Sequence, residues 1–297
     1  MSWFFVLSFI VKNRRYSPYT GIDFLHRGVN MEYVKNVLGY YFRNFLYLII
    51  FAVVPAIFVG LLLKPFGIFE FAFEYHNLTL NNYGEFFVSI FMDSWWSVLY
   101  LFLGLILVII ATSLMLGFIE SHFRMGKPSL INSFSLNNNV LGVAKSTFAL
   151  YFIAFVVEVL LSLLMFFVHF LSGGNVVAII FNYIVAVVVC VLFGYGFNLF
   201  GYATIDMLIN NAPLLVGLSN ASRAGSAKGN RVWFIEVVGF LVCLGIMQIF
   251  TALGLPMIGN IISFILFVPL VCVNSMTLFF ERNNLPRKDI LKYYEMR

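Results

Sequence analysis

Residues 257–280 read MIGNIISFILFVPLVCVNSMTLFF, and residues 281–288, which follow directly, read ERNNLPRK. The first stretch contains no charged residue. It is also long enough to cross a bilayer, because about 20 residues of helix, at 1.5 Å per residue, span about 30 Å of hydrocarbon. Acidic and basic residues return immediately after it. An uncharged apolar run that ends in a charged segment is typical of a membrane-spanning helix.

Five more apolar stretches of similar length precede this one, at residues 45–63, 95–118, 148–171, 176–199 and 237–255. The 297-residue chain as a whole is 62% apolar and only 10% charged, whereas an ordinary soluble domain is about 25% charged. Six spans and their short connections use nearly all of residues 31–297. The sequence therefore predicts an all-α integral membrane protein with six transmembrane helices in a single membrane domain.

The basic residues lie on one side of this predicted domain. Of the 18 lysines and arginines, all but Lys64 come before the first span or after the second, fourth or sixth span. The segment that contains Lys64 also carries Glu70, Glu74, Glu85 and Asp93. Because basic residues are retained on the cytoplasmic side, we expect a multi-pass protein of the plasma membrane with both termini in the cytoplasm.

Composition and motifs argue against several other classes of protein. The net charge of +5 is spread over four segments and no recognition motif accompanies it, so we expect no nucleic-acid partner. Cys190, Cys243 and Cys272 lie inside predicted spans without metal-ligand spacing, which favours small buried residues over a disulfide or a metal site. The chain also lacks the common catalytic motifs. We therefore predict no enzymatic activity, no catalytic residue, no cofactor and no metal.

An internal repeat organises the chain. Each even-numbered span ends in an acidic residue that a proline follows within eight residues, and these pairs are Glu120 with Pro128, Asp206 with Pro213, and Glu281 with Pro286. We interpret the repeated unit as a cytoplasmic interfacial helix followed by a two-span hairpin. Its three copies cover about residues 31–120, 128–206 and 213–281, and they are parallel because each begins on the same side of the membrane.

The interfacial helices are expected at residues 31–44, 130–145 and 214–231. In the first, the apolar residues recur at i, i+3 and i+4, which is the spacing of one helix face; they are Tyr33, Val34, Val37, Leu38, Tyr41 and Phe42. Residues 1–30 are interpreted as an N-terminal extension that the membrane domain does not need. Their apolar run, residues 3–11, precedes its basic residues and is too short to span, which is unlike a signal peptide.

Polar residues inside the predicted spans are the candidate functional residues, because a charge in the membrane is expensive and often functional. Glu158 lies near the centre of the third span. The other candidates are the amides Asn182, Asn198, Gln248 and Asn274. Glu158 could carry a proton or a cation, or it could form a hydrogen bond that only holds the helices together; the second interpretation is favoured. Glu236 is interpreted as an interfacial carboxylate paired with a basic residue.

The segment before the fifth span carries a family resemblance. It contains Ser222, Gly229-Asn230-Arg231 and Trp233-Phe234, and this order resembles the same segment in a group of uncharacterised bacterial six-span proteins. That group is similar in turn to the membrane domain of some glycerophosphodiester phosphodiesterases. The resemblance extends over about residues 31–291, although Ala144-Lys145-Ser146 replaces the expected glycine-basic pair. It implies a bacterial plasma-membrane protein, without the phosphodiesterase activity.

The function favoured by these observations is that of a non-enzymatic multi-pass membrane protein that binds or organises lipids or a membrane partner. Membrane lipids are the first class of partner expected, and other membrane proteins are the second. The alternative is a transporter or channel subunit with Glu158 in its pathway. An enzyme that acts on lipids ranks third.

Overall fold

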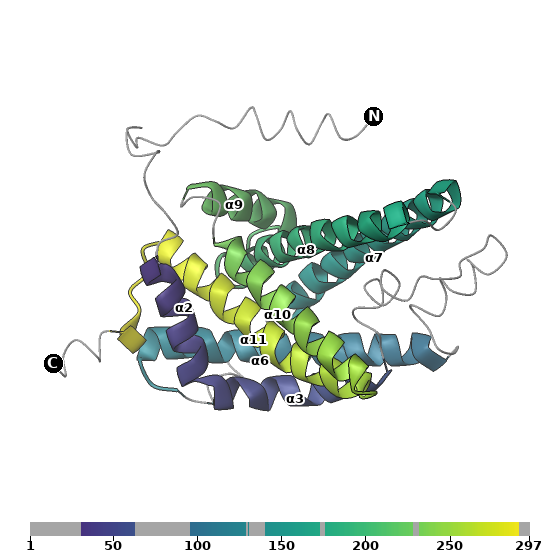
Figure 1. The fold of residues 1–297 in the computed structure, drawn as a ribbon. Coiled ribbons are helices and arrows are strands. Elements are labelled where there is room, and N and C mark those ends of the chain that lie inside the picture. The colour runs from purple at the N-terminus through teal and green to yellow at the C-terminus, as the bar shows by residue number, and fades with distance from the viewer. Residues whose placement is uncertain are drawn as a thin grey trace.

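A computed structural model describes residues 31–62, 96–128, 130, 140–172, 176–227 and 232–290 (Figure 1). The long segments in these ranges are all α-helical. They are α2 (Met31–Arg43), α3 (Phe45–Leu62), α6 (Trp96–Met125), α7 (Val140–Ser172), α8 (Val176–Asn210), α9 (Leu214–Ala227), α10 (Trp233–Ala252) and α11 (Pro256–Arg282). The predicted extension, residues 1–30, and the predicted external segment after the first span lie outside the described residues.

Five of these helices are each long and apolar enough to cross a membrane, namely α6, α7, α8, α10 and α11. The count becomes six if α2 and α3, which meet at a bend of 71°, form one further span. The prediction of a multi-pass helical membrane protein is therefore confirmed. The helices α6 and α8 continue to Met125 and Asn210, beyond the predicted ends of their spans, because a helix extends into its polar flanking residues while hydropathy stops at the last apolar one.

Helix α11 lies at the centre of the bundle and contacts α2, α3, α6, α8 and α10 (Figure 1). Every residue from Cys272 to Phe280 is buried, so this half of α11 is enclosed on all sides. Pro269 lies inside α11 and, having no backbone N–H, removes one hydrogen bond of this helix. The Tyr41 hydroxyl of α2 donates to the Leu266 carbonyl at 3.0 Å, in the turn before this proline. A neighbouring helix thus adds a hydrogen bond to the backbone of α11 in the turn that the proline weakens.

Helix α7 lies at the edge of the bundle, where it packs mainly on α8. Only 6% of the residues in its apolar stretch are buried within the protein. In a membrane-embedded chain such a surface faces lipid or another membrane protein, because neither water nor this chain covers it. Successive spans do contact one another, α3 with α6, α7 with α8 and α10 with α11, but the repeat of three hairpins stays a prediction.

Helix α2 buries the face that its sequence predicts, with one exception. Tyr33, Val37 and Tyr41 are buried against the bundle. Phe42, predicted on the same face, is 69% exposed, and Tyr40 is buried in its place at 3%. At about 100° per residue, Tyr40 lies within roughly 20° of Tyr33 around the helix axis, whereas Phe42 lies on the opposite side. The buried face is therefore centred closer to Tyr33 and Tyr40 than the predicted one, which leaves Phe42 outside it.

The helices α6, α8 and α11 share the same ending. Each is followed by a residue in the left-handed conformation, and that residue lies two positions before a proline. The three residues are Gly126 (φ 70°), Asn211 (φ 52°) and Asn284 (φ 51°), which precede Pro128, Pro213 and Pro286. Glycine and asparagine adopt this conformation most readily. The shared ending is what an internal repeat would produce.

The second interfacial helix differs from its predicted range. Residues 140–145 belong to α7 rather than to a separate helix, and residues 131–139 lie outside the described residues. The third, α9, begins at Leu214, as predicted, and is described to Ala227, whereas residues 228–231 lie outside the described residues. It packs on α8 through Gly217, Ala221 and Ala224, whose small side chains recur at helical spacing and let the two backbones approach closely.

Candidate functional site

A network of buried polar side chains joins four helices near the starts of α2 and α10. Glu236, in the first turn of α10, is 0% exposed. Its Oε1 atom accepts a hydrogen bond from the Asn274 side-chain nitrogen of α11 at 2.9 Å. The prediction that Glu236 is an interfacial carboxylate is therefore wrong. The sequence places it a few residues after Arg231, but the packing of α10 on α11 turns its side chain into the bundle.

The neighbours of Asn274 fix which way its amide points. The Tyr33 hydroxyl of α2 donates to Asn274 Oδ1 at 2.8 Å. Since the oxygen of the amide faces Tyr33, its nitrogen faces Glu236 and also reaches the Val232 carbonyl at 3.4 Å. Asn274 is 0% exposed. Its side chain therefore accepts a hydrogen bond from the tyrosine hydroxyl and donates one to the carboxyl group.

The second carboxyl oxygen of Glu236, Oε2, is buried without a hydrogen-bond partner. Asn198 of α8 is 2% exposed, and its amide interacts with the Glu236 carboxyl group. The contact is too long or too poorly aligned for a hydrogen bond, and both Asn198 Nδ2 and Glu236 Oε2 are buried without a hydrogen-bond partner. The amide nitrogen of Asn198 and the Oε2 atom of Glu236 are thus both buried and both without a hydrogen bond.

The structure brings together only some of the predicted polar residues. Asn198 and Asn274 meet at Glu236, which the sequence analysis placed at the interface and not among the candidate residues. Gln248 is half-buried on α10, 12 residues after Glu236 and about 18 Å further along the helix. The side chains of Glu158 and Asn182, on α7 and α8, lie outside the described residues. Within the described part of the chain, no three histidine, cysteine or acidic side chains are grouped as metal ligands would be.

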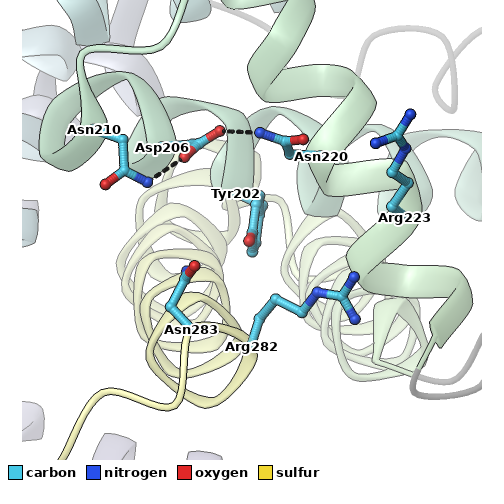
Figure 2. A pocket seen from close by; sticks show the side chains of 7 residues that line it. All are labelled: Tyr202, Asp206, Asn210, Asn220, Arg223, Arg282 and Asn283. Carbon is cyan, nitrogen blue, oxygen red and sulfur yellow. Dashed lines mark hydrogen bonds between the residues drawn. The ribbon is translucent and has the colours of Figure 1, made fainter. Parts of the chain in front are cut away.

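A polar cavity of about 240 Å³ lies between α8, α9 and the end of α11 (Figure 2). Its lining residues are Tyr202, Asp206, Asn210, Asn220, Arg223, Arg282 and Asn283. In Figure 2 the Arg282 side chain extends from the end of α11 toward α9, which carries Arg223. The cavity therefore combines one carboxylate with two guanidinium groups at the predicted cytoplasmic end of the bundle.

Asp206 is held by neutral groups. It is buried, and its two oxygens accept hydrogen bonds from Asn210 at 2.7 Å and from Asn220 at 2.8 Å (Figure 2). Asn220 comes from α9, so the carboxylate anchors α9 to the end of α8. Arg223 and Arg282 line the same cavity as this carboxylate, so two cationic side chains and one anionic side chain share it.

The segment after α11 contains a third polar cluster that sequence analysis missed. Arg287 forms a buried ion pair with Asp289 at 2.8 Å, and its guanidinium lies 3.9 Å from the centre of the Phe123 ring. Nearby, the Tyr40 hydroxyl and His122 Nδ1 are 3.0 Å apart. This cluster fastens the C-terminal segment to α2 and α6. The only sequence signal for it is the short spacing of Arg287 and Asp289, which is common on protein surfaces.

Comparison with models of known protein families, with curated proteins and with solved structures finds no match to this chain. The resemblance of residues 214–234 to bacterial six-span proteins gains no support from these comparisons. It stays an expectation. What the chain does is therefore argued from the geometry of its own residues.

Proposed function

We propose that this protein is a non-enzymatic multi-pass membrane protein that binds lipids, and that it holds an anionic headgroup in the polar cavity at the ends of α8, α9 and α11. The observation that carries this proposal is the pairing of Arg223 and Arg282 around a cavity of about 240 Å³. Guanidinium groups bind phosphate through two parallel hydrogen bonds, so two of them suit a phosphorylated headgroup.

The surroundings of the cavity suit a lipid better than a soluble anion. Leu215, in the first turn of α9, is 80% exposed, and Val216 beside it is also exposed. The same helix carries Asn220 and Arg223, so an apolar surface and the polar cavity lie on one short element. A headgroup in the cavity would place its acyl chains near apolar helix surfaces, whereas free phosphate would use only the cavity.

Native mass spectrometry of the purified protein in mild detergent tests this proposal. We expect wild-type protein to retain an anionic phospholipid, and we expect Arg223→Gln combined with Arg282→Gln to lose at least tenfold in retention. Arg124→Gln is the matched control, because Arg124 is already paired with Glu120 at 2.8 Å on the surface. That variant should retain lipid as wild type does.

Two further measurements identify the chemical class of the ligand. Addition of inorganic phosphate should not displace the lipid if acyl chains contribute to binding, and complete displacement at millimolar phosphate would indicate an anion site instead. A zwitterionic lipid should be retained less than an anionic one. Equal retention of anionic lipid by wild type and the double variant would overturn the assignment of the cavity.

A further inference from the structure

The geometry points to Glu236 as a proton-binding site inside the bundle, in which a neutral carboxylic acid carries its proton on Oε2. This inference is independent of lipid binding in the cavity. It starts from the directions of the hydrogen bonds. Tyr33 donates to Asn274 Oδ1 and Asn274 donates to Glu236 Oε1, so Oε1 is an acceptor. In a carboxylic acid the acceptor is the carbonyl oxygen, which leaves Oε2 as the hydroxyl.

The charge state follows from what surrounds the carboxyl group. Glu236 is 0% exposed, and an ionised carboxylate without water or a cation is strongly disfavoured. Among the described residues its hydrogen-bond donor is a neutral amide, and the second amide nearby, that of Asn198, is also neutral. Two neutral amides replace only part of the hydration that a carboxylate has in water.

The titratable groups near Glu236 do not supply a positive charge. Helix α2 contributes Tyr33 and α11 contributes Cys272, and both interact electrostatically with Glu236. Helix α8 contributes Asn198, which does not titrate. Glu281 and Arg287 also act on Tyr33, with opposite signs. In the described part of the chain, ionised Glu236 would thus be a single negative charge among neutral groups, and binding one proton removes it.

The network also gives protonation a structural consequence. Glu236 connects α10 to α11 through Asn274, and Asn274 connects α11 to α2 through Tyr33. A negative charge on Glu236 would be buried at this junction without a cation, which is unfavourable, and it would draw water toward Oε2. Release of the proton would therefore destabilise the packing of α2, α10 and α11 around Asn274.

Infrared spectroscopy of the protein in lipid bilayers tests this assignment directly. We expect wild type at neutral pH to show the carbonyl band of a protonated carboxylic acid, and Glu236→Gln to remove it. Glu120→Gln is the matched control, because Glu120 lies in a surface ion pair with Arg124 at 2.8 Å. Absence of the band in wild type, its persistence in Glu236→Gln, or its removal by Glu158→Gln instead would overturn the proposal.

A second variant and a second measurement keep the test independent of how well Glu236→Gln folds. Asn198→Leu keeps the carboxyl group but changes the surroundings of Oε2, so the band should shift, and an unchanged band would contradict the assignment. Melting temperatures provide the other measurement. Wild type should lose stability as the pH rises and the proton is released, while Glu236→Gln should not, and parallel profiles would overturn the proposal.

Discussion

The side-chain amide of Asn274 donates a hydrogen bond to Glu236 Oε1 at 2.9 Å, and this contact joins the central helix α11 to the first turn of α10. The two residues are separated by 38 positions in the chain. Both are fully buried. Because Tyr33 donates to the oxygen of the same amide, one asparagine connects three helices, and its loss should affect all of them.

Replacement of this asparagine should destabilise the protein more than replacement of another asparagine in the same helix. Asn274→Leu leaves Glu236 Oε1 without its donor and removes the nearer of the two acceptors of the Tyr33 hydroxyl, which keeps only the main-chain carbonyl at 3.2 Å, so we expect a loss of about 1–3 kcal/mol in the free energy of unfolding. Asn260→Leu is the control, because Asn260 is also buried in α11 but its Oδ1 has no partner. Thermal unfolding in detergent measures both. An equal loss in the two variants would show that the network adds no stability.

The close approach of α8 to α10 should be sensitive to a single methyl group. A Cβ atom at Gly194 would overlap the side chain of Val237, whereas a Cβ atom at Gly245 would meet nothing within 4 Å. Gly194→Ala should therefore lower the free energy of unfolding by about 1–3 kcal/mol, the usual effect of overpacking. Gly245→Ala should change it by less than about 1 kcal/mol. Similar melting temperatures for both variants would contradict this packing.

The buried ion pair of the C-terminal segment should behave unlike a surface pair. Arg287→Leu leaves Asp289 buried without its partner, so we expect a loss of about 3–5 kcal/mol. Arg287→Leu combined with Asp289→Leu should recover much of that loss. Arg124→Leu, which breaks the exposed pair with Glu120, should change stability by less than about 1 kcal/mol. Chemical unfolding of the four proteins compares them, and a double variant no better than Arg287→Leu would disagree with this account.

The orientation of the chain is open to a direct test. The distribution of basic residues predicts that a reporter active only in the cytoplasm will function when fused to the C-terminus. The same reporter inserted near Asn81, in the predicted external segment, should be inactive. Activity measured in cells for the two fusions, with expression levels matched by immunoblot, decides the orientation. The reverse pattern would place the polar cavity on the external side.

The alternative function makes its own prediction at Glu158. If this residue lies in a transport pathway, Glu158→Gln should abolish a pH- or cation-dependent flux into proteoliposomes while the melting temperature stays within a few degrees. If Glu158 only forms a hydrogen bond between helices, Glu158→Gln should be nearly neutral and Glu158→Leu should cost up to about 1.7 kcal/mol. A Gln variant that transports normally would exclude Glu158 from the pathway.

The sequence alone determined the membrane architecture, because hydropathy and helix length depend on residues that are adjacent in the chain. It also predicted most of the buried face of α2, although Tyr40 lies within that face and Phe42 lies outside it. The buried state of Cys190, Cys243 and Cys272 was confirmed for the same reason. These properties are local, because they depend on residues within one or two helical turns of each other in the chain.

Tertiary structure alone decided where the polar residues meet. Glu236 is close to a basic residue in the sequence, which favoured an interfacial position, but the packing of α10 on α11 encloses it beside Asn274. The cavity around Asp206 likewise needs α8, α9 and the end of α11 together. Hydrogen bonds between residues far apart in the chain depend on how the helices rotate and cross. Close packing sets that rotation, through contacts such as Gly194 with Val237. The hydrophobic periodicity of a single segment cannot predict it.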